Sequence, residues 1–218
     1  MTLQQQLADK KAEFSAVAPQ ETQAIMAEAN ETLASSGITN QTLSTGDVVP
    51  TFSLPNATGT SINIQTLLSQ GPVVIAFYRG QWCPYCNLEL RALQQALPEI
   101  QNQGATLVAI SPQTPDNSLS TVEKNELEFE VLSDEGNAVA RQFGLVFQLP
   151  ESLRPIYQGF GIDLPAHNGD DTFELPFAAT YVIAPSGQIV HGFVDTDYKQ
   201  RMEPSDIVTA LEAIAVSP

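Results

Sequence analysis

Two continuous apolar segments, separated by a segment with helical periodicity, dominate the middle of the chain. Residues 72–78 and residues 105–110 are apolar and rich in β-branched side chains, as in strands covered on both faces of a sheet. Between them, apolar residues recur at the spacing of one helix face: Leu88, Leu90, Leu93, Ala96, Leu97 and Ile100. The pattern predicts a strand, a helix and a second, parallel strand, which together make a βαβ unit.

Shorter elements are predicted on both sides of this unit. Residues 2–36 have apolar positions at helical spacing that Pro19 interrupts, which predicts two helices. The remaining pattern predicts short strands within 48–54 and 61–68, a helix over 117–127, a strand over 129–132, a helix over 135–143, a hairpin of 179–184 with 188–194, and a last helix over about 204–215. This alternation predicts an α/β fold with a central mixed sheet flanked by helices.

The texture of the sequence changes near residue 46. Residues 1–45 are predicted to form an N-terminal helical extension, and residues 46–218 a single α/β domain. Within that domain, residues 145–176 carry scattered Pro, Gly and Asp with little periodicity, and the segment is too long for an ordinary connection. We therefore expect an insertion at about 145–176 that acts either as a lid or as a docking segment.

The net negative charge of the chain limits the classes of partner that it is expected to bind. Lys and Arg total 9 and Asp and Glu total 25 in 218 residues, and the formal net charge of −16 repels phosphate backbones and anionic lipid head groups. We therefore expect no nucleic-acid partner and no membrane partner. The N-terminus has no apolar signal core, and no segment approaches about 18 consecutive apolar residues, so a soluble, cytoplasmic protein is expected.

The chain contains 2 cysteines, and both lie in the stretch Trp82-Cys83-Pro84-Tyr85-Cys86, between the first buried strand and the predicted helix. Cys83 then lies near the N-cap and Pro84 at the first helical position. Unpaired backbone N–H groups and the helix dipole favour a thiolate there, and such placement lowers a cysteine pKa from about 8.5 to roughly 3.5–7.5. Arg79 adds positive charge nearby. The pattern predicts a redox-active dithiol that can close to a disulfide.

Two other roles for the cysteines fit less of this pattern. Cysteines that only fill a core would more often be scattered, and Pro-Tyr between them at a helix start has no packing reason. A metal site would have to recruit His167 and His191, the 2 histidines of the chain, which lie far from the pair and lack the usual ligand spacing. We therefore expect neither a metal nor another cofactor.

Segments 46–54, 77–80, 132–134, 139–144 and 179–183 occur in an order that resembles the peroxiredoxins of the alkyl hydroperoxide reductase / thiol-specific antioxidant (AhpC/TSA) superfamily. The resemblance spans about residues 46–215. Residues 164–171 and 193–198 are similar to bacterial peroxiredoxin-like proteins that carry a C-x-x-C, whereas Cys-Pro-Tyr-Cys itself is the glutaredoxin tetrapeptide and Trp82 is what thioredoxins have before theirs. The resemblance implies a thioredoxin-like fold of the peroxiredoxin type.

The same resemblance implies roles for the site residues. On the peroxiredoxin pattern P-x-x-x-T/S-x-x-C, Cys86 takes the peroxidatic place, Cys83 replaces the hydroxyl residue and Arg79 replaces the proline. The arginine expected just before the strand at 179–183 is Ala178, and the buried acid of thioredoxins is Phe77. A Cys86 thiolate would then reduce a hydroperoxide, Cys83 would resolve the sulfenic acid as a disulfide, and Arg79 would hold the thiolate.

The tetrapeptide leaves two other function classes open. In a thiol-disulfide oxidoreductase, Cys83 would attack a partner's disulfide and Cys86 would resolve the mixed disulfide. A redox-sensing binding protein without turnover is the third class. In the enzymatic readings we expect Trp82, Pro84 and Tyr85 to contact the substrate, an external thiol such as thioredoxin, glutaredoxin or glutathione to act as reductant, and the chain to form a possible homodimer.

Four further residues, Glu89, Arg91, His167 and His191, are assigned a position or a role. Glu89 and Arg91 lie one turn into the predicted helix and are expected on a solvated face. His167 is either a proton donor near the dithiol or a loop histidine satisfied by its neighbours, and His191 is expected to be structural.

Overall fold

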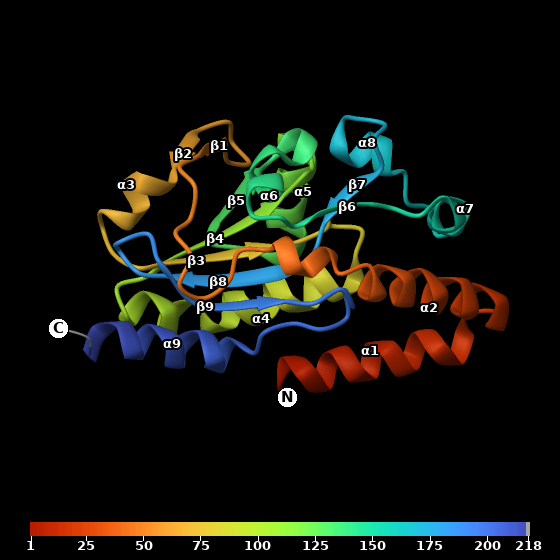
Figure 1. Cartoon of the computed structure of the whole chain (residues 1–218), viewed down its shortest axis with the longest axis horizontal. Coiled ribbons are helices and arrows are strands. Elements are labelled where there is room, and N and C mark those ends of the chain that lie inside the picture. The colour runs from red at the N-terminus through yellow and green to blue at the C-terminus, as the bar shows by residue number, and fades with distance from the viewer. Residues whose placement is uncertain (217–218) are drawn as a thin grey trace.

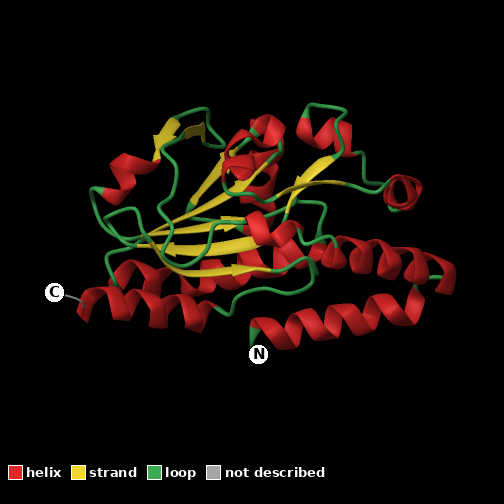
Figure 2. Ribbon diagram, in the orientation of Figure 1, coloured by secondary structure: helices red, strands yellow, loops and turns green. Residues whose placement is uncertain are grey.

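The central strand β3 (Val73–Phe77) is completely buried and has neighbours on both sides. In the computed structural model, which describes residues 1–216 and the side chains of residues 1–214, five strands form the main sheet in the order β5-β4-β3-β8-β9 (Figures 1 and 2). β4 (Thr106–Ser111) and β5 (Glu130–Ser133) extend the sheet in parallel, and β8 (Ala179–Ile183) and β9 (Ile189–Val194) extend it antiparallel. The predicted mixed sheet, βαβ unit and hairpin are confirmed.

Helices cover both faces of the sheet because β3 sends alternate apolar side chains to opposite sides. Val74 and Ala76 belong to a core that includes α4 (Pro84–Asn102) and α9 (Pro204–Val216). Val73, Ile75 and Phe77 belong to the opposite core, which includes the short helices α3 (Ile64–Leu68) and α6 (Ala138–Gln142). A short loop, residues 78–83, leads from the carboxyl end of β3 to the N-terminus of α4, where the two cysteines lie.

Four predicted elements have different bounds or a different type. The strand predicted within 48–54 is reduced to β1 (Ser53–Pro55), with Val48 making only an isolated bridge. The strand predicted over 61–68 stops after β2 (Ser61–Asn63), because the Asn63 side chain accepts a hydrogen bond from the Thr66 amide at 3.1 Å and caps α3. The helix predicted over 135–143 starts as a 3₁₀ turn, η2 (Glu135–Asn137), and that over 117–127 is α5 (Pro115–Asn125).

The N-terminal segment forms the two predicted helices, α1 (Leu3–Val17) and α2 (Gln20–Ser35), and then the 3₁₀ turn η1 (Ile38–Gln41). The two helices make a hairpin that projects beyond the sheet (Figure 1). The buried residues of α1 are Leu3 and Leu7, which join the core around α4. The rest of α1 therefore lies outside the main core.

Residues 145–176 contain more regular structure than their sequence predicts. β6 (Val146–Gln148) and β7 (Glu174–Pro176) pair antiparallel, and between them lie η3 (Glu151–Leu153), α7 (Arg154–Gly159) and α8 (Leu164–Asn168). The segment lies above the α1–α2 hairpin in Figure 1, and η3 contacts α2. The described helices include none that is long and apolar enough to cross a membrane.

Candidate functional site

The two cysteines lie in the first turn of α4. Cys83 is the N-cap, with φ −85° and ψ 113°, and Pro84 occupies the start of the helix. Both thiols are free, and both residues are buried, with 1% of Cys83 and 0% of Cys86 exposed. The helix N-terminus thus brings backbone N–H groups to the two sulfurs. The Cys86 amide favours the thiolate form of Cys83, whereas burial of the pair opposes it.

The loop that leads into the dithiol is fixed by polar side chains. The Gln81 amide donates to Oε1 of Gln113 at 2.8 Å, and the Gln81 carbonyl accepts from Nδ2 of Asn87 at 2.8 Å and from Nζ of Lys124 at 2.9 Å. Gly80 has φ +151°, and a Cβ there would lie 2.3 Å from Nε1 of Trp82. Only glycine therefore permits the loop to bring Trp82 back against its own backbone.

Arg201 contacts Cys86 from the far end of the chain. Its Nη2 donates to Sγ of Cys86 at 3.4 Å, and its Nε donates to Oε2 of Glu89 at 2.6 Å. Nη1 donates to the carbonyl groups of Tyr198 and Gln200. The guanidinium is thus buried, paired and aimed at one sulfur of the dithiol.

The prediction that Glu89 lies on a solvated face is wrong. Glu89 is 1% exposed, and its Oε1 accepts a hydrogen bond from Thr180 at 3.4 Å. Burial raises the pKa of Glu89 to about 7, although Arg201 opposes the shift. The helix periodicity places Glu89 one turn after Cys86 on the same side of α4, where the ion pair with Arg201 compensates its burial.

The N-terminus of α1 holds the segment that carries Arg201. Nε2 of Gln4 donates to the Arg201 carbonyl at 2.6 Å. The backbone amides of Leu3 and Gln4 donate to the carboxylate of Glu203 at 3.3 and 2.6 Å. A carboxylate at a helix N-terminus is stabilised by the dipole and by the free N–H groups. The helix α1 is therefore linked to the dithiol through Arg201, whose carbonyl accepts from Gln4 and whose guanidinium donates to Cys86.

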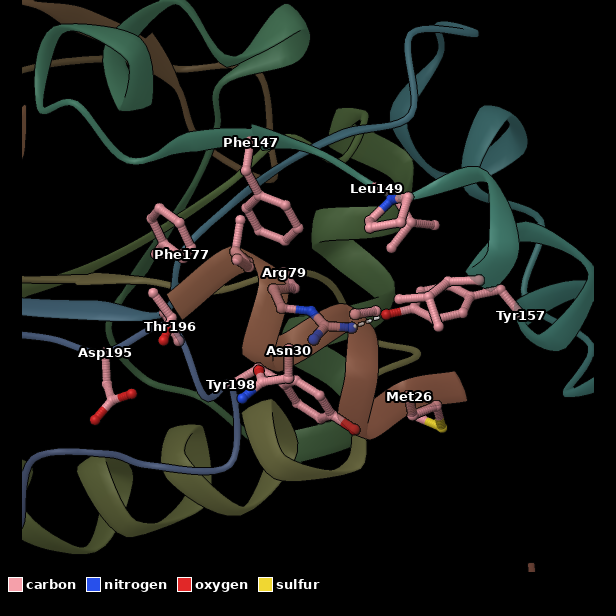
Figure 3. A pocket seen from close by; sticks show the side chains of 15 residues that line it. Met26, Asn30, Arg79, Phe147, Leu149, Tyr157, Phe177, Asp195, Thr196 and Tyr198 are labelled. Atoms are coloured by element: carbon pink, nitrogen blue, oxygen red, sulfur yellow. Dashed lines mark hydrogen bonds between the residues drawn. The ribbon is translucent and has the colours of Figure 1, made fainter. Parts of the chain in front are cut away.

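Arg79 is enclosed by aromatic rings. Its Nη2 donates to the Tyr157 hydroxyl at 2.5 Å, and its guanidinium carbon lies 4.2 Å from the ring centroid of Tyr198 and 4.9 Å from that of Trp82. Figure 3 shows the guanidinium between Tyr157 and Tyr198. These three residues line a small cavity of about 30 Å³. Nε of Arg79 has no hydrogen-bond partner among the described residues. The charge is kept close to both sulfurs, whose thiolate forms it favours.

The electrostatic environment separates the two thiols. Burial raises the pKa of Cys83, but the hydrogen bond from the Cys86 thiol and the charges of Arg79 and Arg201 outweigh burial and lower this pKa to about 6. Burial, together with the neighbouring Cys83, raises the pKa of Cys86 well above its ordinary value, although both arginines oppose that shift. At neutral pH these shifts favour a reduced pair with the negative charge on Cys83 and the proton on Cys86.

The thiolate should be visible in a pH titration. We expect the absorbance at 240 nm of the reduced protein to rise by one thiolate with a midpoint near pH 6, because the pKa of Cys83 is lowered to about 6 while that of Cys86 is raised. The thiolate is lost as the pH falls through this midpoint. The Cys83→Ser/Cys86→Ser protein is the blank. A midpoint at the ordinary thiol value of 9.0 would contradict the electrostatic picture.

Trp82, Pro84 and Tyr85 surround the entrance to Cys83. The Trp82 ring lies 5.5 Å from that of Tyr157, and the Tyr85 ring lies 5.5 Å from that of Tyr198. Pro84 is exposed. All three line one cavity together with Cys83, whereas Cys86 is not among the residues that line it. The expected substrate contacts are thus brought together, but only one of the two sulfurs is in the cavity wall.

Sequence reasoning missed Arg201, Tyr157 and Tyr198 as site residues. They lie 115, 78 and 119 positions from the residues that they contact or approach (Cys86 and Arg79), and no local pattern marks them. His167 uses its backbone carbonyl to accept from the Thr114 amide at 3.1 Å, and it is not among the residues that line the dithiol cavity. Within residues 1–214, no group of His, Cys, Asp and Glu could hold a metal ion.

The sequence of this chain is similar to that of a known protein family. Residues 45–192 match the AhpC/TSA family. The putative peroxiredoxin Rv1608c of Mycobacterium tuberculosis is 34% identical over 114 residues, which cover 52% of this chain and 74% of that protein. Peroxiredoxin Bcp of Escherichia coli is 33% identical over 103 residues, which cover 47% of this chain and 65% of that protein. The α1–α2 hairpin and Arg201 lie outside the matched residues.

Solved structures give the same result. Peroxidoxin BcpB from Mycobacterium tuberculosis superposes with a TM-score of 0.62 at 26% identity, over 79% of this chain and 98% of that chain. Peroxiredoxin Q from Xanthomonas campestris superposes with a TM-score of 0.58 at 20% identity, over 75% of this chain and 91% of that chain, and at this identity it shows the fold alone. The predicted resemblance is confirmed: the chain belongs to the AhpC/TSA family and has its peroxiredoxin-type, thioredoxin-like fold.

Proposed function

We propose that this protein is a thiol-dependent peroxidase that reduces hydroperoxides through Cys86 and Cys83. The observation that carries the proposal is the contact at 3.4 Å between the buried Arg201 guanidinium and Sγ of Cys86, at the head of α4 in an AhpC/TSA fold. A cation at this place stabilises the Cys86 thiolate, which is the nucleophilic form. The family resemblance leads us to expect an arginine at the position of Ala178, and Arg201 supplies the positive charge that is missing there.

The reaction starts from the single thiolate of the reduced pair. The proton of Cys86 passes to Cys83, and the Cys86 thiolate attacks the distal oxygen of the hydroperoxide. An S–O bond forms, the O–O bond breaks, and the leaving alkoxide takes the proton from Cys83 to become an alcohol. Cys86 is now a sulfenic acid and Cys83 is again a thiolate, held by Arg79.

The second half of the cycle closes the disulfide. The Cys83 thiolate attacks the sulfenic sulfur of Cys86, the S–O bond breaks, and the leaving hydroxide takes a proton from solvent to become water. Two electrons and two protons from an external dithiol, or from two thiols, then reduce the Cys83–Cys86 disulfide. We propose thioredoxin, glutaredoxin or glutathione as this donor. Trp82, Pro84 and Tyr85 would contact the substrate at the entrance.

The remaining organisation is proposed on the same basis. Residues 1–45 would be an N-terminal extension to a domain of residues 46–218, and residues 145–176 an insertion whose Tyr157 reaches Arg79. A cytoplasmic location and a homodimer stay predictions.

A second candidate function is the reduction of protein disulfides with Cys83 as the first nucleophile. Two observations favour it: the pKa of Cys83 is lowered to about 6 by the Cys86 thiol and the two arginines against the effect of burial, and Cys83 alone of the pair lines the cavity. In this mechanism the Cys83 thiolate attacks a partner's disulfide, and Cys86 then releases the partner.

The two candidates differ in the oxidant that they consume. We expect the wild-type protein to reduce tert-butyl hydroperoxide catalytically with dithiothreitol or thioredoxin as donor, one peroxide for each dithiol oxidised, and to reduce insulin disulfides much more slowly. The measurement is peroxide loss over time. The Cys83→Ser/Cys86→Ser protein is the control. Insulin reduction without peroxide loss would instead support the disulfide reductase.

A further inference from the structure

The guanidinium of Arg201 is bonded to the loop that carries it as well as to the dithiol. Residues 195–203 connect β9 to α9, and Nη1 of Arg201 donates to two carbonyl groups of this loop, those of Tyr198 and Gln200. Nη2 donates to Sγ of Cys86 at 3.4 Å. Because the guanidinium and its loop are held together, whatever fixes the position of the loop also fixes the contact with Cys86.

The helix α1 attaches this loop to a neighbouring element. Nε2 of Gln4 donates to the Arg201 carbonyl at 2.6 Å, and the amides of Leu3 and Gln4 donate to the Glu203 carboxylate at 3.3 and 2.6 Å. Among the described residues, the backbone hydrogen bonds of residues 195–200 stay within the loop. Those bonds shape the loop, whereas the bonds from α1 determine where the part that carries Arg201 lies.

The start of α1 is itself fixed against α4. Leu3 and Leu7 are buried and belong to the core that includes α4. Thr2 and Gln5 form a capping box that starts the helix at Leu3, and the first-turn amides have no partner inside the helix, so Glu203 can accept from two of them. A continuous set of contacts therefore runs from α4 through α1 and the Arg201 loop back to the sulfur on α4.

We propose that Gln4 and Glu203 are positioning residues, which hold the Arg201 loop on α1 and thereby keep the guanidinium in contact with Sγ of Cys86. This inference rests on the proposed peroxidase function, in which that contact stabilises the attacking thiolate. Neither residue lines the cavity that contains Cys83 in its wall. Both therefore act through Arg201 and not on the substrate.

Gln4→Met tests the proposal, because methionine keeps the length of the side chain but cannot donate a hydrogen bond. A guanidinium held less firmly stabilises the thiolate less, so the midpoint of the titration at 240 nm should rise by roughly half a pH unit from its place near pH 6. The first turnover with hydrogen peroxide should slow roughly threefold. Gln4→Met/Glu203→Met removes both attachments and should enlarge both changes.

Gln23 provides the matched control in the same hairpin. Its Nε2 donates to the carbonyl groups of Ser15 and Ala18 at 3.0 and 2.8 Å, at the end of α1 away from Arg201. Gln23→Met therefore removes the same kind of hydrogen bond, from a glutamine side chain to backbone. It should affect the Tm of the protein but change neither the midpoint of the titration nor the rate of the first turnover.

A double-mutant cycle separates positioning from a general loss of stability. The background is the Arg201→Met/Glu89→Gln protein, which has no guanidinium at this site and no unpaired Glu89 charge. Adding Gln4→Met to this background should change neither the midpoint nor the rate further, because no cation is left to be positioned. In the wild-type background the same substitution should change both.

Three outcomes would overturn the inference. A wild-type midpoint and rate in Gln4→Met/Glu203→Met would mean that the two residues do not position Arg201. Equal effects of Gln4→Met with and without Arg201 would mean that Gln4 acts elsewhere, and equal effects of Gln23→Met would mean that any loosening of the hairpin suffices. A wild-type protein that does not consume peroxide would instead contradict the proposed function, and the titration separates the two failures because it needs no turnover.

Discussion

Replacing Cys86 with serine is expected to abolish peroxide consumption, whereas Cys83→Ser should still react once. In the proposed mechanism Cys86 attacks the peroxide, so its loss returns the rate to that of the uncatalysed reaction. The Cys83→Ser variant keeps the attacking sulfur and the Arg201 contact at 3.4 Å, but it cannot close the disulfide. Its sulfenic acid should persist and be trapped by dimedone, one adduct per chain at Cys86, as mass spectrometry would show.

The opposite pattern would reverse the assignment. Dimedone labelling of Cys83 in the Cys86→Ser variant, together with an inert Cys83→Ser variant, would make Cys83 the first nucleophile, as its lowered pKa and its place in the cavity wall favour. Finding the Cys83–Cys86 disulfide in the wild type does not separate the two orders, because both end in that bond. The single variants are therefore the decisive proteins.

Removal of the Arg201 charge should produce the second-largest effect. Arg201→Met is expected to raise the midpoint of the thiolate titration above pH 6 and to slow peroxide reduction roughly 10²- to 10³-fold, as the loss of one charge-stabilising donor does in other active sites. The measurements are the absorbance at 240 nm against pH and the rate of the first turnover. Arg201→Lys should restore part of the rate, because lysine returns the positive charge but not the separate guanidinium contacts to Cys86 and Glu89.

Two further variants keep this test interpretable. Arg201→Met leaves Glu89 buried without its ion pair, which costs about 3–5 kcal/mol when one partner of a buried pair is removed. The Arg201→Met/Glu89→Gln protein removes both charges and should fold better, while remaining slow. Arg141→Met is the matched control, since Arg141 forms an exposed ion pair with Glu174 at 2.6 Å and should leave the titration unchanged. Wild-type rates of peroxide reduction in Arg201→Met and in Arg201→Met/Glu89→Gln would show that Arg201 does not stabilise the reacting thiolate.

The N-terminal hairpin contacts the segment that carries Arg201 and also lines the cavity that contains Cys83. Gln4 binds the Arg201 carbonyl at 2.6 Å, and Phe14 lines the cavity at the other end of the same helix. The helix α1 (Leu3–Val17) lies outside the residues that match the family, 45–192.

The sequence by itself determined the framework and the dithiol. β3, α4 and β4 follow from local periodicity, and the position of Cys83 and Cys86 at the start of α4 follows from the order of strand, loop, proline and helix. Such features depend on residues that are neighbours in the chain, and their spacing is written directly in the sequence. The strand predicted over 61–68 failed for a local reason, the capping of α3 by Asn63.

Only the tertiary structure decided which charges surround the sulfurs. The ion pair between Glu89 and Arg201 joins residues 112 positions apart, and the bond from Arg79 to Tyr157 joins residues 78 positions apart. Glu89 looks solvated in the sequence because a charged residue normally avoids burial, and only its partner from the loop before α9 makes burial tolerable. Pairing across such distances is set by how the helices and loops pack on the sheet, which no local pattern specifies.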